Sequence, residues 1–547
     1  MPRVDWSLPA AFDALASGAP QRDVLVWKDT RRTYADVARR SRGLAAFFRG
    51  HGLGVRRERP ELERWECGQS PVALVLWNCP EYVEAMLGAF RARAVPFNVN
   101  QHYRPEEIRA LFDMLDAEAV VYHRALGPLL ASATQGRRLS WIEVDDGSGT
   151  APLPGSTSFA AAAATTDGLT DLPEPSPDDL CLVCTGGTTG SPKAVLWRQA
   201  DIFVGAMGGT EDASRESLAA RAASGGGTWF AAPPLMHAAA QWTAFAAIHG
   251  GGTVVLHDDS APFDARTILE TVQRERVNLM SIVGDAFARR LIDEMRRTPY
   301  DLSSLTTLAT GGAITSADCK QQLLELLPNA IIVDGYGASE TGGMAFGATS
   351  RGGVSRTFSL GAGGAVLSAD RTRFLAPGDD EVGWTARRGR VPLGYLGDRA
   401  QTEQTFPIIG GERVAVPGDR ARLTPEGQVV LLGRDAMVVN SGGEKIFVEE
   451  VEEALRRHAD VVDAVVVGRP SERFGEEVVG VVQLRPGAPR DAAVLREFAA
   501  RTIARFKAPR AIAFCDAVRR HASGKPDYAW ARTVAKDALA ATGSDAP

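Results

Sequence analysis

Thr185-Gly186-Gly187-Thr188-Thr189-Gly190-Ser191-Pro192-Lys193 is the stretch that decides how this chain is interpreted, and it follows the apolar run 180–184. Its glycines let the backbone approach an anion closely, its hydroxyls and successive N–H groups can face phosphate oxygens, and Lys193 adds positive charge. It is not a Walker loop, because a proline stands between the last glycine and the lysine and residues 194–196 read as a strand. A flexible hairpin turn is the alternative.

Length and composition predict a soluble enzyme of more than one domain. At 547 residues, 45% hydrophobic and 23% charged, the chain is too long for one core. A net charge of -6 gives no reason to expect nucleic acid or an anionic membrane as partner. Six scattered cysteines suit a reducing cytoplasm, and the Cys181/Cys184 pair reads as part of an apolar strand, not a metal site. No targeting segment and no apolar run of roughly 18 residues is visible, so we expect a cytoplasmic protein without a membrane span.

Alternating helical and strand-like patterns predict an α/β fold. Helical spacing covers 34–49 and 81–93 around a short apolar strand at 72–77. This rhythm predicts a large N-terminal domain of mixed sheets covered by helices. The stretches 145–178 and 208–227, rich in small residues, are predicted to be loose surface connections.

After Arg434 the pattern becomes a compact unit, predicted as a small mobile α+β C-terminal domain. Its expected elements are strands at 436–440, 461–467 and 477–484 and helices at 448–458 and 491–504. The expected domains are therefore 1–434 and 435–547.

Two glycine-rich segments downstream of the loop can build a nucleoside pocket. They are Thr310-Gly311-Gly312-Ala313 and Ile331-Ile332-Val333-Asp334-Gly335-Tyr336-Gly337-Ala338-Ser339-Glu340-Thr341-Gly342. Glycines leave room for a flat base, Tyr336 offers a stacking face, and Glu340 is a carboxylate suited to Mg²⁺ shared with phosphates. Taken singly, Tyr336 is as well explained as a core residue and Glu340 as a solvated surface charge.

Together with the phosphate loop, these segments resemble the adenylate-forming superfamily, which contains acyl-CoA synthetases, peptide-synthetase adenylation domains and firefly luciferase. The likeness runs almost end to end. Further matching positions are Asn78-Cys79-Pro80-Glu81-Tyr82, Pro96-Phe97-Asn98-Val99-Asn100, Pro234-Leu235-Met236-His237, Gly418-Asp419, Gly433-Arg434, Ser441-Gly442-Gly443-Glu444-Lys445-Ile446 and Ser523-Gly524-Lys525.

The resemblance implies ATP, Mg²⁺ and coenzyme A as cofactors. It places ATP on Thr185, Gly186, Gly187, Thr189, Gly190, Lys193, Gly311, Gly312, Ala313, Asp334, Tyr336, Gly337, Ser339, Asp419 and Arg434. Asp419 would accept hydrogen bonds from both ribose hydroxyls, and Lys525 would bridge the substrate carboxylate and the α-phosphate. Lys525, Thr188, Glu340 and His237 are the expected catalytic residues, with Glu340 on the metal.

The resemblance also implies a second half-reaction on a different face of the small domain. Gly442 and Gly443 would let the pantetheine arm of coenzyme A pass close to the backbone. The hinge position, usually Asp or Lys, carries Ala436 here, which makes adenylation the more secure half-reaction; a one-residue offset to Asp435 can compensate.

His237 would gate the carboxylate pocket, although a structural histidine explains it nearly as well. Small residues suit a roomy apolar channel; they are Ala231, Ala232, Ala238, Ala239, Gly284 and Ala313.

The predicted function is an ATP-dependent acyl-CoA synthetase for a large apolar acid, long-chain or polycyclic, acting through acyl-AMP. The expected partner is a small-molecule carboxylic acid, and the protein a monomer or homodimer. An acyl-AMP ligase that hands the adenylate on is the nearest alternative, and an inactive binding homologue is an alternative of another class. Luciferase chemistry has no positive sign here. A peptide-synthetase module is disfavoured because no carrier domain follows Lys525.

Overall fold

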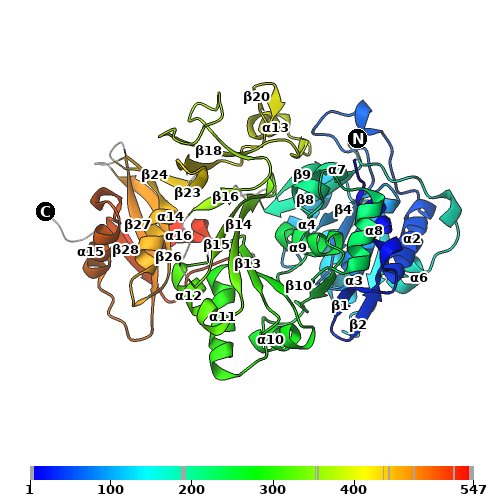
Figure 1. Cartoon of the computed structure of the whole chain (residues 1–547), viewed down its shortest axis with the longest axis horizontal. Helices are drawn as coiled ribbons and strands as arrows, with labels where there is room; N and C mark the ends of the chain where they lie inside the picture. Colours follow the sequence, from blue (N-terminus) through cyan, green and yellow to red (C-terminus); the bar gives the residue numbers. More distant parts are fainter. Residues whose placement is uncertain are drawn as a thin grey trace.

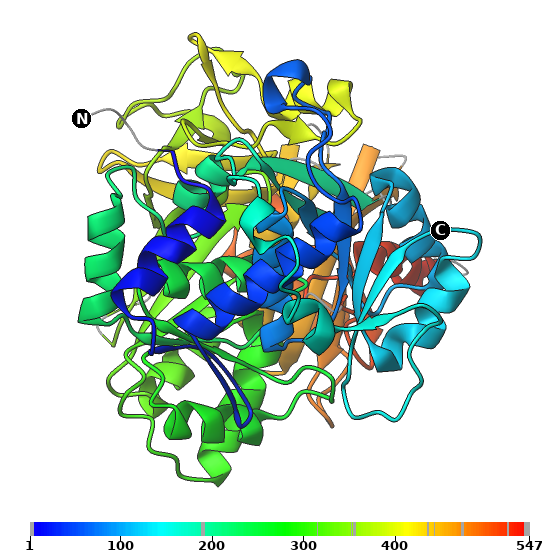
Figure 2. The ribbon, with the colours of Figure 1, turned by 90° about the vertical axis from the view of Figure 1, so that its right-hand side faces the viewer.

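The computed structural model describes residues 5–186, 192–313, 315–351, 353, 357–434, 437–441, 444–471, 475–521 and 524–540. A large N-terminal body lies beside a smaller C-terminal unit, as predicted (Figure 1). Seen from the side of the N-terminal helices, the small unit (orange) lies behind the body (Figure 2). No helix of the described ranges combines the length and apolarity needed to cross a bilayer.

Five parallel strands form the first sheet, in the order β4-β3-β5-β6-β7. The strands are β3 (Pro71–Val75), β4 (Val95–Asn98), β5 (Ala119–His123), β6 (Ser140–Val144) and β7 (Thr157–Ser158). The helices of this region are α2 (Tyr34–Gly50), α3 (Pro80–Arg91), α4 (Pro105–Leu115), α5 (Gly127–Ala133) and α6 (Phe159–Ala163). Strands β3, β4 and β5 are buried along their whole length, as parallel strands covered on both faces should be. The strand and the two helices predicted here are confirmed within two residues.

The largest sheet has thirteen strands in the order β17-β18-β22-β23-β16-β15-β14-β13-β12-β10-β11-β1-β2. They are β1 (Asp23–Trp27), β2 (Thr30–Thr33), β10 (Thr228–Ala231), β11 (Thr253–Leu256), β12 (Leu279–Ile282), β13 (Thr307–Gly311), β14 (Ile331–Ala338), β15 (Gly342–Thr349), β16 (Phe358–Leu360), β17 (Gly364–Leu367), β18 (Val382–Arg387), β22 (Asp419–Leu423) and β23 (Gln428–Arg434). Its helices are α1 (Leu8–Gly18), α8 (Arg215–Ser224), α9 (Ala238–His249), α10 (Ala265–Arg274), α11 (Gly284–Arg297) and α12 (Ala317–Leu326).

Within this sheet, β1, β11, β10, β12, β13 and β14 are parallel, and β14 begins an antiparallel run that ends at β17. The parallel part of the sheet therefore meets the antiparallel part at β14. In open α/β sheets, ligands bind beyond the carboxyl ends of the parallel strands.

A three-stranded antiparallel sheet carries the phosphate-loop segment. Its strands are β8 (Leu180–Gly186), β9 (Pro192–Arg198) and β19 (Gly394–Tyr395), in the order β19-β9-β8. Nearby elements are α7 (Gln199–Gly205), α13 (Arg399–Thr405), β20 (Ile408–Ile409) and β21 (Glu412–Arg413). Short 3-10 helices elsewhere are η1 (Arg59–Glu61), η2 (Arg124–Leu126), η3 (Leu169–Asp171) and η5 (Arg505–Lys507).

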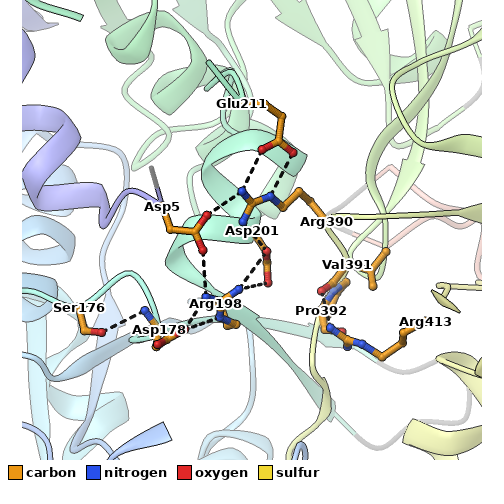
Figure 3. A network of polar contacts seen from close by, with 10 residues as sticks. All are labelled: Asp5, Ser176, Asp178, Arg198, Asp201, Glu211, Arg390, Val391, Pro392 and Arg413. Atoms are coloured by element: carbon orange, nitrogen blue, oxygen red, sulfur yellow. Dashed lines mark hydrogen bonds and ion pairs between the residues drawn. The ribbon is translucent and has the colours of Figure 1, made fainter. Parts of the chain in front are cut away.

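A network of ion pairs fixes β9 and α7 against the segment that leads to β19 (Figure 3). Arg390 reaches Asp5 at 2.7 Å, Asp201 at 3.0 Å and Glu211 at 2.9 Å, and Arg198 at the end of β9 shares Asp5 and Asp201 at 3.2 Å. Arg390 is 8% exposed and Asp201 5% exposed, so each needs the opposite charge of the other. The network therefore locks the register in which β19 lies along β9.

The C-terminal unit has a five-stranded sheet with apolar clusters on its two faces. The strands are β24 (Val438–Ser441), β25 (Glu444–Phe447), β26 (Val461–Ser471), β27 (Gly475–Leu484) and β28 (Ala511–Cys515), and the helices are α14 (Val448–Arg456), α15 (Ala492–Thr502) and α16 (Tyr528–Ala540). The predicted elements are present, and β26 runs four residues further than expected.

The two stretches predicted to be loose connections contain helices, so that part of the prediction was wrong. Helix α8 lies within 208–227; Ser214 caps it, and Leu218 and Ala222 are buried in the main core. Helix α6 lies within 145–178 and buries Phe159. Runs of alanine and serine hide the helical period, because only one or two larger side chains in each mark the buried face.

Candidate active site

The predicted ribose acceptor is already held by neutral hydroxyl groups. The Tyr336 hydroxyl donates to Oδ2 of Asp419 at 2.7 Å and lies 3.0 Å from Thr385 Oγ1. Asp419 begins β22, Thr385 lies in β18 and Tyr336 lies in β14, so three strands of one sheet meet here. Asp419 is 8% exposed. Arg434, which ends β23, is the register partner of Asp419, so the sheet brings the two predicted ribose residues to the same point.

The turn between β14 and β15, which carries Ser339 and Glu340, is held by two long side chains. Trp197 Nε1 donates to Ser339 O at 2.9 Å. Arg387 Nη1 donates to the carbonyls of Thr341 and Gly343 at 2.9 and 2.7 Å. Arg387 is 4% exposed, and burial lowers its pKa. Its buried charge therefore fixes the turn through carbonyl dipoles.

A glycine is required where this turn closes. A β-carbon at Gly337 would lie 2.0 Å from the carbonyl oxygen of Gly342, so no larger residue fits without moving the backbone. This explains one glycine of the motif by packing alone.

Glu340 and Lys193 meet on Tyr395. The Tyr395 hydroxyl donates to Glu340 Oε1 at 2.7 Å, and the Lys193 ammonium lies 5.3 Å from the centre of the same ring. Strand pairing places Lys193 near Tyr395. Tyr395 of β19 pairs with Val195 of β9, and Lys193, two residues earlier in β9, pairs with Thr185 of β8. The structure thus joins the lysine of the phosphate loop to the predicted metal ligand.

The donor set at this point fits Mg²⁺ bound mainly by phosphate oxygens. Within the described ranges, no group of three or more His, Cys, Asp or Glu is arranged to hold a metal ion. A carboxylate such as Glu340, held by one oxygen, can present the other to a hard cation that keeps several oxygens from phosphate and water.

The predicted base pocket has glycine backbone on one side. Gly311 is the last residue of β13, and Gly312 and Ala313 follow it directly. Asp334 pairs with Thr310 in the parallel register and receives a 2.7 Å ion pair from Lys320 of α12. Burial raises the pKa of Asp334, and the lysine opposes that rise.

His237 stands at the N-terminus of α9, and its Nε2 is buried without a hydrogen-bond partner among the residues that the structure describes. Burial and, to a smaller extent, the positive charges of Lys525 and His102 lower the pKa of His237 to about 4. The imidazole is therefore neutral at physiological pH and has one ring nitrogen available for a ligand.

Lys525 lies on a hairpin that the C-terminal unit extends toward the large body. Arg520 pairs with Pro526 across the hairpin and holds Asp463 of β26 at 2.7 Å. Gly524, with φ of 76°, approaches the body so closely that a β-carbon there would lie 3.1 Å from Val283 Cγ1 and 4.0 Å from the Ala313 β-carbon. The hairpin therefore brings Lys525 to the end of the glycine segment after β13.

Several predicted positions lie outside the described residues. They are Gly187, Thr188, Thr189, Gly190, Gly442, Gly443 and the hinge residues Asp435 and Ala436. Thr185 and Gly186 end β8, directly before the loop. The predicted roles of the loop and of the hinge stay predictions.

Three contacting residues escaped the sequence analysis. Thr385, Tyr395 and Trp197 lie 49, 55 and 142 positions from the residues that they contact, Tyr336, Glu340 and Ser339, and only the folded sheets bring them together. Tyr395 has a weak signal, a Gly-Tyr pair, but nothing in the sequence says that it faces Lys193. Of the small residues expected to line an apolar channel, Ala231, Ala232 and Gly284 are buried, whereas Ala238, Ala239 and Ala313 are at least partly exposed.

Two family models match this chain, one in the large N-terminal body and one in the smaller C-terminal unit. Residues 12–382 match the model of the AMP-binding enzyme family, and residues 450–525 match that of the AMP-binding enzyme C-terminal domain. The chain belongs to the AMP-binding enzyme family. This confirms the predicted family.

Among the relatives of this chain are acyl-CoA ligases of actinobacteria, which confirm the predicted enzyme class. The medium-chain acyl-CoA ligase Mig of Mycobacterium avium is 45% identical over 97% of this chain and 98% of its own length. The 3-oxocholest-4-en-26-oate–CoA ligase of Rhodococcus rhodochrous is 36% identical over 94% of this chain and 93% of its own. Among solved structures, ATP-bound MatB of Rhodopseudomonas palustris has a TM-score of 0.79 at 22% identity, covering 97% of this chain and 99% of MatB, which confirms the fold.

Proposed function

We propose that this AMP-binding enzyme is an ATP-dependent acyl-CoA ligase that activates a large apolar carboxylic acid, long-chain or polycyclic, through an acyl-AMP intermediate. Residues 1–434 would form the adenylation domain and 435–547 the domain that carries Lys525. The observation that carries the proposal is the position of the Lys525 hairpin, against Val283 and Ala313 and close enough to His237 to depress its pKa.

ATP would lie along the line from Asp419 to Lys193. The ribose hydroxyls donate to Asp419, the base lies between the Gly311–Ala313 backbone and Tyr336, and the phosphates face the loop that ends in Lys193. Mg²⁺, when bound, would neutralise phosphate charge next to Glu340. Tyr395 contacts both Glu340 and Lys193 and therefore fixes their separation before ATP arrives.

The acid would enter on the His237 side. Neutral imidazole can donate or accept a hydrogen bond at a carboxylate without adding charge. Attack of the carboxylate oxygen on the α-phosphorus breaks the bond to pyrophosphate and increases negative charge on the transferring group. The Lys525 ammonium stabilises that charge.

The second step would use coenzyme A. Its thiolate attacks the acyl carbon, AMP leaves, and the thioester forms. Gly442 and Gly443 are the proposed path of the pantetheine arm, and a turn about residues 435–437 would replace the Lys525 face by that path.

Two product measurements test the proposal. Purified protein is incubated with ATP, Mg²⁺, coenzyme A and a panel of medium-chain, long-chain and sterol side-chain acids, with pyrophosphate and acyl-CoA measured separately. Both products in equal amounts support the ligase. Acid-dependent pyrophosphate without thioester would favour an adenylate-forming ligase that hands its product on, as Ala436 at the hinge position suggests. No pyrophosphate with any acid would contradict the proposal.

A further inference from the structure

Two buried asparagines stand side by side at the carboxyl edge of the first parallel sheet. Asn98 is the last residue of β4, and Asn78 follows the neighbouring strand β3, whose Leu74 is the register partner of Asn98. Asn98 is 8% exposed and Asn78 is 1% exposed. Buried amides of this kind persist only when their donors and acceptors are used, so their partners say what each one does.

The side chain of Asn78 bonds the segment that precedes His237. Its Oδ1 accepts from Leu235 N at 2.6 Å, and its Nδ2 donates to Pro233 O at 3.3 Å. Its own backbone N–H donates to Asp259 Oδ1 at 2.6 Å. Asn78 thus fixes one side of the chain that leads to α9.

Asn98 holds that segment and the base of the phosphate loop together. Its Nδ2 donates to Met236 O at 2.6 Å and to Cys184 O at 2.9 Å, and its Oδ1 accepts from Cys184 N at 2.9 Å. Cys184 lies in β8, one of the two edge strands of its three-stranded sheet. The Asn98 amide therefore bonds the backbone of that edge as a neighbouring strand residue would.

The Asn98 side chain bonds two residues, and each of them directly precedes a residue near the proposed reaction. Met236 precedes His237, and Cys184 precedes Thr185, which pairs with Lys193. Cys184 is 9% exposed and Met236 is 3% exposed. If the Asn98 amide were removed, water could not reach their backbone groups to replace its hydrogen bonds without opening the core.

We infer that Asn98 is a positioning residue that sets the distance between the carboxylate end and the phosphate end of the site, whereas Asn78 positions the carboxylate end alone. This inference rests on the proposed function for its account of His237 and the loop. It predicts different consequences for two neighbouring asparagines of the same sheet edge.

Matched variants separate the two roles. Calorimetry of Mg²⁺–ATP binding without acid is run on the wild type, Asn98→Ala, Asn98→Asp and Asn78→Ala, and the KM for the best acid is measured by pyrophosphate release. Asn98→Asp keeps side-chain volume and Oδ1 but removes the donor to Cys184 O and Met236 O. We expect both Asn98 variants to weaken ATP binding and raise the acid KM, each by about tenfold. Asn78→Ala should raise the acid KM by a similar factor and leave ATP binding within about twofold.

Thermal unfolding of each variant shows which proteins fold. If Asn98→Ala does not fold, Asn98→Asp tests the inference by itself. Equal effects of Asn98→Asp and Asn78→Ala on ATP binding, or no effect of Asn98→Asp on it, would overturn the inference. A wild type that binds ATP but releases no pyrophosphate with any acid would instead contradict the proposed function, and the calorimetric comparison would still judge Asn98.

Discussion

The two ends of the site are prepared for ligands in opposite ways. At the proposed ribose end, the Tyr336 hydroxyl donates a hydrogen bond to Asp419 before any nucleotide arrives. At the proposed carboxylate end, His237 has a buried ring nitrogen with no hydrogen-bond partner among the described residues. A satisfied carboxylate is oriented in advance, whereas an unsatisfied imidazole is destabilised until a ligand supplies the missing hydrogen bond. The first arrangement favours ready binding of ATP, and the second favours discrimination for an acid.

The largest expected effect tests the charge that the C-terminal unit brings to the carboxylate end. Lys525→Ala should reduce pyrophosphate release by about 10²–10³-fold, since a preorganised cation at the developing charge is lost. Thioester formation from supplied acyl-AMP should largely survive. Rapid-quench assays of the two half-reactions measure the split. Lys536→Ala, at an exposed lysine on α16, is the control, and equal loss of both half-reactions in Lys525→Ala would contradict separate roles for the two faces.

The next prediction concerns the proposed ribose end, where Asp419 is already oriented. Asp419→Ala should weaken ATP binding by about 10²-fold, because hydrogen bonds from hydroxyls to a charged acceptor are lost. Titration calorimetry with ATP and with 2′,3′-dideoxy-ATP measures it: the variant should bind both nucleotides alike, whereas the wild type should prefer ATP. A wild type indifferent to the two hydroxyls would place the ribose elsewhere.

A third prediction uses the lowered pKa of His237. Its folded pKa of about 4 lies below the ordinary value of 6.5, so the unfolded chain binds the proton first. The stability contribution of the neutral imidazole is therefore complete above pH 6.5 and is lost as the pH falls toward 4. Wild type should lose about 1–2 kcal/mol more unfolding free energy than His237→Gln between pH 7.5 and pH 5. Urea unfolding at both pH values measures the difference, and parallel losses would show that the imidazole is not buried in solution.

The smallest expected effect comes from removing the hydrogen bond between Tyr336 and Asp419. Tyr336→Phe removes the hydroxyl that holds Asp419 and keeps the ring, so ATP binding should weaken by about fivefold, or ~1 kcal/mol. Calorimetry again measures it, with Tyr300→Phe, whose hydroxyl bonds Glu294 on α11, as the matched control. A loss as large as that in Asp419→Ala would mean that the ring is displaced as well.

The site residues that we propose from the sequence all lie in continuous motifs, and the contacts that the sequence missed are those that strand pairing creates. Asp419, Glu340 and Lys525 stand in short segments whose order identifies the family. Thr385 and Tyr395 reach Tyr336 and Glu340 across 49 and 55 positions, and no local pattern signals such contacts. The missed helix α8 has the same physical cause, since alanine and serine leave the buried face of a short helix without contrast.

The hairpin that carries Lys525 also makes His237 sensitive to the position of the smaller lobe. Burial is the main cause of the imidazole's weak basicity, and the ammonium of Lys525 is the next. Any swing that takes Gly524 away from Val283 withdraws that ammonium and lets the ring hold a proton more readily. Such an opening would therefore raise the pKa of His237, and the ¹⁵N resonances of this one histidine would report the position of a lobe to which it does not belong.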